Sequence, residues 1–244
     1  MEIPPPFTAN GEHIEIALGD ARALFTTRRG GCSSPPYDTL NLGLATEDSV
    51  QAARANRAAL ASSLGVSFLY GRQVHGATVA TSDHPTDPGG APIEADGHAT
   101  AARGVAPLVL SADCLPIALA GDGAVAMLHA GWRGLAAGVI PNGVDALRRL
   151  GAHGPLQAAI GPGAGVCCYE VGEEVHAALR TPAQARRGGN ADLKLLAAMQ
   201  LEGVGVERVH DVGLCTICAD AALFFSHRRD HGRTGRQAGV AWLS

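Results

Sequence analysis

Apolar residues dominate the middle of the chain, where residues 105–120 contain a single charge. A run of this kind is typical of a buried β-strand, and the shorter apolar stretch at residues 124–128 predicts a partner strand. Between them, Gly121-Asp122-Gly123 has the composition of a tight turn. The pattern therefore predicts a β-hairpin in the centre of the fold.

The register of this hairpin decides which side chains meet across it. If the turn is centred on positions 121 and 122, Cys114 faces His129 directly. If it is centred on positions 122 and 123, Cys114 pairs with Gly131, and His129 lies diagonal to it on the same face. A three-residue loop would instead place the thiol and the imidazole on opposite faces. Either two-residue turn thus predicts that Cys114 and His129 are neighbours.

Strands and helices are mixed along the rest of the chain, and no repeat of fixed period occurs. Further strands are predicted at residues 21–27, 73–79, 157–160 and 240–243, and helices at residues 49–64, 173–179, 192–202 and around 224–225. Another helix is expected to run toward Leu150, starting at Leu135 or, because of Pro141 and Gly143, near Asn142. This order predicts a mixed α+β fold in a single domain covering residues 1–244.

Local signals define the ends of two helices. Asp48 or Ser49 is expected to cap the helix at 49–64 and Gly65 to end it, while Asn190 and Gly203 bound the helix at 192–202. In the first of these helices, the arginines at positions 54 and 57 are assigned to the solvent-facing side.

Composition narrows the classes of function. The formal net charge is −4 and no basic run occurs, which argues against nucleic acid as the main partner. No apolar run reaches membrane-spanning length and the N-terminus lacks the pattern of a signal peptide, so we expect a soluble cytoplasmic protein. A monomer or a homodimer is expected. In that compartment the six cysteines are expected to be free thiols.

Two histidines and one of the cysteines form a candidate metal site. His75, Cys114 and His129 would supply two imidazoles and one thiolate, and catalytic zinc sites commonly have three protein ligands and one open position. The alternative is a buried free cysteine beside two hydrogen-bonded histidines. A second metal site at Cys167-Cys168 and Cys215-Thr-Ile-Cys218 is disfavoured, because adjacent cysteines do not easily point at one ion and a lone CxxC is a weak signal.

Six motifs resemble, in order, those of the bacterial purine nucleoside phosphorylase family that was formerly labelled multi-copper polyphenol oxidoreductase or laccase. They are Thr26-Thr-Arg-Arg-Gly-Gly31, Leu40-Asn-Leu-Gly43, Gln73-Val-His-Gly76, Ala112-Asp-Cys-Leu-Pro116, His129-Ala-Gly-Trp-Arg-Gly134 and Phe224-Phe-Ser-His-Arg-Arg229. The resemblance covers nearly the whole chain. It implies a layered sandwich with mixed β-sheets inside and helices outside.

The resemblance also implies a site and an activity. His75, Cys114 and His129 would be the catalytic residues that hold zinc, with copper as the alternative metal. The activity would be phosphorolysis of adenosine, inosine, guanosine and methylthioadenosine to the free base and ribose 1-phosphate, together with deamination of adenosine by attack of water at C6. Arg28 would bind phosphate through its planar fork, and lesser candidates for substrate contacts are Asn41, Gln73, Asp113 and Arg133.

Three rival classes of function remain open. A metal-free hydrolase would use Cys114 as the nucleophile and His129 as the base. A copper-dependent polyphenol oxidase would need more histidine and methionine ligands than the sequence offers. A non-enzymatic protein with a structural zinc would need a fourth ligand, and the sequence does not point to one.

Overall fold

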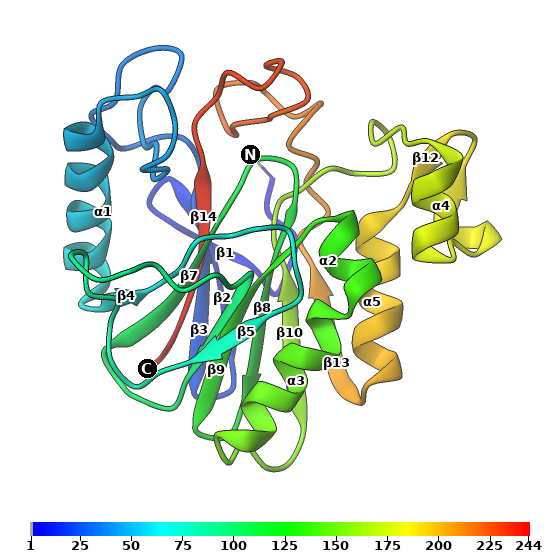
Figure 1. Cartoon of the computed structure of the whole chain (residues 1–244), viewed down its shortest axis with the longest axis horizontal. Helices are drawn as coiled ribbons and strands as arrows, with labels where there is room; N and C mark the ends of the chain where they lie inside the picture. Colours follow the sequence, from blue (N-terminus) through cyan, green and yellow to red (C-terminus); the bar gives the residue numbers. More distant parts are fainter. Residues whose placement is uncertain (1) are drawn as a thin grey trace.

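The computed structural model describes residues 2–244, and in this range the chain forms two six-stranded mixed sheets and five α-helices (Figure 1). In spatial order, the first sheet consists of β1 (Thr8–Asn10), β2 (His13–Leu18), β3 (Ala21–Phe25), β14 (Gln237–Leu243), β7 (Val105–Ser111) and β4 (Ser67–Leu69). The second consists of β13 (Val206–Asp211), β10 (Leu156–Ile160), β8 (Leu115–Gly121), β9 (Ala124–Ala130), β6 (Gly97–Thr100) and β5 (Val79–Thr81). A two-stranded ribbon of β11 (Arg186–Arg187) and β12 (Asn190–Ala191) follows a short 3-10 helix (Ala183–Ala185).

The two sheets pack face to face, and helices cover their outer faces. Helix α1 (Val50–Leu64) lies against the first sheet (Figure 1). On the second sheet lie α2 (Trp132–Ala137), α3 (Val139–Arg149), α4 (Glu173–Leu179) and α5 (Leu193–Gly203). None of the helices within residues 2–244 is long and apolar enough to cross a membrane.

Alternating side chains of the central strands build separate layers of the core. Leu115, Ile117 and Leu119 of β8 point toward the helices of the second sheet, whereas Ala118 and Ala120 point toward the first sheet. Small side chains on this inner face allow the two sheets to approach closely, and burying the apolar faces on both sides drives this packing. The predicted mixed α+β fold, with sheets inside and helices outside, is confirmed.

The apolar run at residues 105–120 is not one strand, as the sequence predicts, but two strands in different sheets. Residues 105–111 form β7 in the first sheet, and residues 115–121 form β8 in the second. Between them Asp113 has a φ of 89°, which turns the chain out of one sheet and into the other. Cys114 lies at the end of this crossing, directly before β8.

The hairpin of β8 and β9 has the register in which Cys114 and His129 are diagonal. Pro116 pairs with His129, and Gly121 pairs with Ala124, so the turn is centred on positions 122 and 123. The residue at 123 has a φ of 76°, which glycine adopts at little cost. The direct pairing of Cys114 with His129 is therefore wrong, whereas their position on one face is confirmed.

Two of the predicted helices have the expected ends, and two differ. Helix α1 is capped by the Ser49 side chain and ends at Gly65, and α4 spans the predicted residues. The helix expected from residue 135 or 142 instead begins at Trp132 and divides into α2 and α3. Pro141 falls in the first turn of α3, where its missing N–H needs no partner within the helix. Helix α5 is capped by Asp192 and not by Asn190.

Three further predictions are wrong. Residues 73–78 are a loop, and only Val79–Thr81 of that region forms a strand. Phe224 and Phe225 lie in an irregular segment instead of a helix. Arg57 packs its guanidinium over Tyr70 at 4.5 Å and lines a cavity, so it does not point to solvent as Arg54 does.

Candidate metal centre

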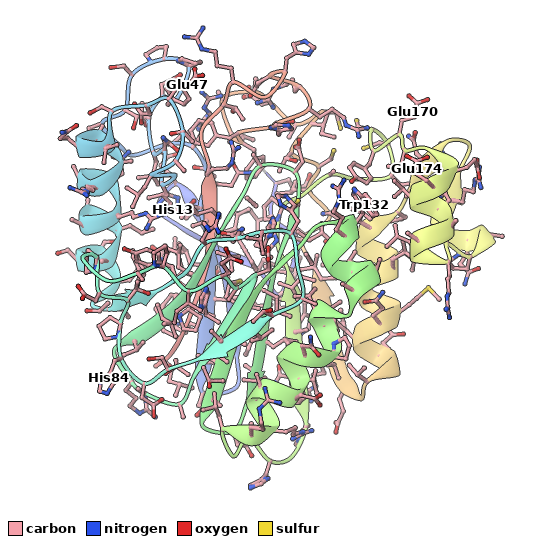
Figure 2. The ribbon with its side chains drawn as sticks, viewed as in Figure 1. His13, Glu47, His84, Trp132, Glu170 and Glu174 are labelled. Carbon is pink, nitrogen blue, oxygen red and sulfur yellow. The ribbon has the colours of Figure 1, made fainter. Side chains whose placement is uncertain are left out.

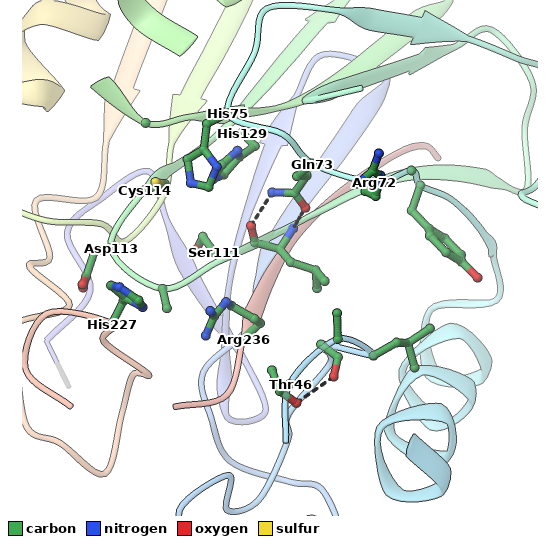
Figure 3. Close-up of a pocket in the computed structure, with 18 of the residues that line it drawn as sticks. Thr46, Arg72, Gln73, His75, Ser111, Asp113, Cys114, His129, His227 and Arg236 are labelled. Carbon is green, nitrogen blue, oxygen red and sulfur yellow. Dashed lines mark hydrogen bonds between the residues drawn. The ribbon is translucent and has the colours of Figure 1, made fainter. Parts of the chain in front are cut away.

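His75, Cys114 and His129 come together at one end of the two sheets (Figure 3). Their candidate ligand atoms all lie within 4.8 Å of one another. The rings of His75 and His129 meet edge to face, with centroids 4.9 Å apart and an interplanar angle of 76°. The three residues come from a loop, from the crossing between the sheets and from the end of β9.

His129 is buried and oriented by a carboxylate. Its Nδ1 lies 2.8 Å from Oδ1 of Asp96, and its main-chain N–H donates to the Asp96 carbonyl at 2.6 Å. This contact leaves Nε2 free to act as a ligand, in the carboxylate–histidine–metal arrangement that fixes the tautomer of many metal-binding histidines.

The same carboxylate holds the loop that carries His75. Oδ1 of Asp96 accepts the N–H of His75 at 2.9 Å, and Oδ2 accepts those of Val74 and Gly76 at 3.0 and 2.7 Å. These bonds hold His75 at a φ of 59°, a conformation that costs a non-glycine residue about 1–3 kcal/mol. Asp96 thus positions two of the three candidate ligands.

The charges of the site support one another. Burial raises the pKa of the Cys114 thiol, but the charge of His129 and hydrogen bonds from both histidines outweigh it and lower that pKa to about 6. Burial lowers the pKa of His129, but the Cys114 charge and Asp96 outweigh it and raise that pKa to about 9. Cys114 is therefore a thiolate near neutral pH, which is the form that binds metal or attacks as a nucleophile.

Gly131 leaves the space that the cluster fills. A Cβ at this position would lie 2.8 Å from the Cys114 sulfur and 3.5 Å from Cδ2 of His75. Because a Cβ would come this close to the sulfur, any larger residue at position 131 would displace it.

The donor set fits zinc. Two imidazole nitrogens and one thiolate sulfur match a catalytic zinc site with one position left for a ligand. They also bind copper, so donor chemistry alone favours neither metal. Within residues 2–244 only one other group of this kind occurs, and it consists of four cysteines.

The cluster opens into a cavity of about 830 Å³, which is within the usual range for sites that bind small molecules. Five arginines line it; Arg72 pairs with Glu94, and the other four are Arg57, Arg133, Arg228 and Arg236. Across residues 2–244 none of the ion pairs involves these four guanidinium groups. The cavity therefore has positive charge available for an anion.

Three of the predicted substrate contacts line this cavity. Arg133 stacks over Trp132 at 4.3 Å. Gln73 also lines it, but its side chain exchanges two hydrogen bonds of 2.8 Å with the Leu110 main chain (Figure 3). Asp113 accepts the hydroxyl of Thr216 at 2.7 Å and the N–H of Arg228 at 2.8 Å, so both of its oxygens already hold the protein together.

Arg28 and Asn41 do not line the cavity. The Arg28 guanidinium donates to the carbonyls of Pro36, Asp38 and Ala221 and to the Asp38 carboxylate, and it stacks over Phe225. Asn41 is fully buried and accepts the N–H of Arg236 at 2.9 Å. The hydrogen-bonding groups of both residues are already engaged by the protein, so both residues hold segments of the chain together.

Several residues of the site are absent from the predicted set. Asp96 gives no sequence signal, since its partners lie 20 or more residues away in the chain. The arginines near the C-terminus are divided by the structure: Arg228 and Arg236 line the cavity, whereas Arg229 pairs with Asp230. Tyr169 also lines the cavity, and burial together with the Cys114 charge raises its pKa to about 12, so its hydroxyl stays a donor.

A family model described as multi-copper polyphenol oxidoreductase laccase matches residues 22–244. The chain belongs to this family. The chain is also similar to a protein named purine nucleoside phosphorylase from Streptomyces coelicolor, which is 43% identical over 97% of each chain. A second protein of that name, from Pseudomonas aeruginosa, is 40% identical over 91% of this chain and 93% of its own.

A solved structure has the same fold as this chain. The Bacillus licheniformis hypothetical protein YfiH superimposes with a TM-score of 0.89 at 30% identity, covering 99% of this chain and 100% of its own. The resemblance seen in the six sequence motifs is therefore confirmed.

Proposed function

We propose that this protein is a zinc-dependent purine nucleoside phosphorylase that also deaminates adenosine at the same site. The observation that carries the proposal is the cluster of His75, Cys114 and His129 at the wall of a cavity lined by four arginines without carboxylate partners. Relatives about 40% identical over most of the chain carry the name purine nucleoside phosphorylase. A nucleoside and an anionic co-substrate are the pair of ligands that such a cavity suits.

His75, Cys114 and His129 would hold the metal, which supplies a Lewis acid at a position open to the cavity. Asp96 keeps both imidazoles in the orientation that binding requires. The Tyr169 hydroxyl is a neutral donor for a polar group of the substrate.

In phosphorolysis an oxygen of phosphate bonds to C1′ of the ribose while the bond from C1′ to the purine breaks, and the base leaves with a proton. The protein must therefore hold phosphate beside the sugar. We assign this role to Arg133 and Arg236 instead of Arg28. In the described chain the Arg133 guanidinium makes no hydrogen bond to protein, and Arg236 uses only Nη1, for the carbonyls of Thr234 and Gly235.

The phosphate dependence of inosine cleavage tests this assignment. Arg133→Ala should raise the KM for phosphate by about 10- to 100-fold, the effect of losing a charged hydrogen bond of about 1.5–3 kcal/mol. Deamination consumes water, so it should be affected less. Arg54→Ala, an exposed arginine on α1, is the matched control. An unchanged phosphate KM in Arg133→Ala would remove this residue from the phosphate site.

A metal-free hydrolase is a second candidate, favoured by one observation. Cys114 would be the nucleophile and His129, which interacts with it, the base. Asp96 contacts His129 in turn and orients it, which is the arrangement of cysteine hydrolases. The two candidates differ at His75. Its replacement by Ala should abolish both metal retention and activity in the metalloenzyme, whereas a hydrolase needs only Cys114 and His129. Activity of metal-stripped His75→Ala protein would refute the zinc proposal, and elemental analysis would separate zinc from copper.

A further inference from the structure

Four cysteines form a second cluster, which belongs to none of the functions described so far. Cys167, Cys168, Cys215 and Cys218 place their sulfur atoms within 4.8 Å of one another. All four are free thiols, and the sulfur atoms of Cys167 and Cys218 are separated by 3.5 Å. A disulfide bond requires about 2.05 Å, so this pair is in contact but not bonded.

The sequence argument against this cluster fails because of the local backbone. Residues 166–168 form a tight turn, in which the N–H groups of Cys168 and Tyr169 both donate to the carbonyl of Gly165 at 3.0 Å. In a helix-like turn, neighbouring side chains diverge by about 100° and not by the 180° of a strand. Both adjacent sulfurs can therefore reach the same point.

We propose that these four cysteines bind one zinc ion in a closed structural site. With Zn–S distances of about 2.3 Å, a tetrahedral site has sulfurs about 3.8 Å apart. The observed sulfur separations, 3.5 Å between Cys167 and Cys218 and at most 4.8 Å for the others, are close to this spacing. Because all four positions would be protein ligands, none would remain for substrate.

The two segments that carry the cysteines are held together by the backbone. Gly163 and Cys215 form an isolated bridge, the N–H of Thr216 donates to the Gly163 carbonyl at 3.1 Å, and the N–H of Gly163 donates to Leu214 at 3.3 Å. The N–H of Gly165 also donates to the Cys215 sulfur at 3.2 Å, a contact that stabilises a ligating thiolate. The ligands are thus arranged before any ion binds.

The site lies where it would stiffen the wall of the large cavity. Tyr169, which follows Cys168, lines that cavity, and Thr216, which follows Cys215, donates its hydroxyl to Asp113 beside Cys114. Glu170, which follows Tyr169, lies at the side of the molecule close to α4 (Figure 2). Cys167 and Cys218 are exposed, so an ion can enter from solvent.

Zinc content of protein purified under reducing conditions tests the proposal. The Cys167→Ser/Cys218→Ser variant should contain one zinc per chain fewer than the wild type. Cys32→Ser, which removes the only cysteine outside both clusters, should match the wild type. His75→Ala should keep the ion of the four-cysteine site, whether or not the centre of His75, Cys114 and His129 binds zinc. The zinc content of this variant therefore tests the four-cysteine site independently of the proposed function.

A second measurement needs no substitution in the cluster. His75→Ala protein stripped of metal and reloaded with Co²⁺ should show the strong thiolate-to-cobalt charge-transfer absorption of a site with four thiolates, and added zinc should remove it. Equal zinc content in the serine variant and the wild type would overturn the proposal. So would weak cobalt absorption, or an intact mass two hydrogens short, which indicates a disulfide.

Discussion

Replacing Asp96 with asparagine tests whether a single carboxylate organises the candidate metal centre. Oδ1 of Asp96 accepts hydrogen bonds from the N–H of His75 and from Nδ1 of His129, and Oδ2 accepts them from the N–H groups of Val74 and Gly76. An asparagine has one acceptor oxygen and one NH₂ group. Whichever way it is turned, the NH₂ group faces two donors, so two of the four hydrogen bonds are lost.

The size of the effect follows from these two bonds. Hydrogen bonds to a charged group contribute about 1.5–3 kcal/mol each, so Asp96→Asn should lower the free energy of unfolding by about 3–6 kcal/mol. For a chain of this length, each kcal/mol lowers Tm by about 2–4 °C. Loss of a partner that orients a ligand typically weakens metal binding by about 10- to 100-fold.

Two assays measure the two effects in parallel. Thermal unfolding followed by circular dichroism gives the change in Tm, and competition with a chelator gives the change in zinc affinity. Asp83→Asn is the control, because exposed Asp83 accepts the Thr100 hydroxyl and the Ala101 N–H through Oδ1 alone, which asparagine can replace. Wild-type zinc affinity in Asp96→Asn would refute the role of Asp96 in positioning the ligands.

Three further outcomes are expected. Gly131→Ala should weaken zinc retention, because its Cβ would press on the Cys114 sulfur, whereas Gly203→Ala, with nothing within 4 Å, should leave retention unchanged; equal retention in both would contradict the steric argument. Burial lowers the pKa of His98 to about 4, so the unfolded chain takes up a proton that the folded chain refuses, and stability should fall by up to about 3 kcal/mol as the pH drops from 6.5 to 4. In urea titrations His98→Met should lose this dependence, and an unchanged slope would assign it to another group. Arg28→Lys should lower Tm without raising the phosphate KM, and a raised KM would return Arg28 to the phosphate site.

The features that could be predicted from the sequence are those decided locally. The caps of α1 lie next to the residues that they cap, and the parity of a two-residue turn places Cys114 and His129 on one face. By contrast, β7 and β8 are equally apolar, so hydrophobicity alone does not reveal that they belong to different sheets. The switch depends on backbone conformation at Asp113 and on the pairing of β7 with β14 near the end of the chain.

The least predictable features of the site depend on distant partners. Asp96 is one carboxylate among many until the fold brings the loop of His75 against it. The four cysteines are two unremarkable pairs until residues 166–168 turn and the segments around Gly163 and Cys215 meet. Arg28 shows the converse case, since its motif indicates a ligand contact while the fold engages its guanidinium in protein contacts.

The short crossing between β7 and β8 also affects how the molecule unfolds. Only residues 112–114 separate an interior strand of the first sheet from an interior strand of the second. Three residues span about 10 Å, the distance between packed sheets, so neither sheet can move away while the other stays intact. The two sheets should therefore exchange their amide hydrogens with a common opening free energy.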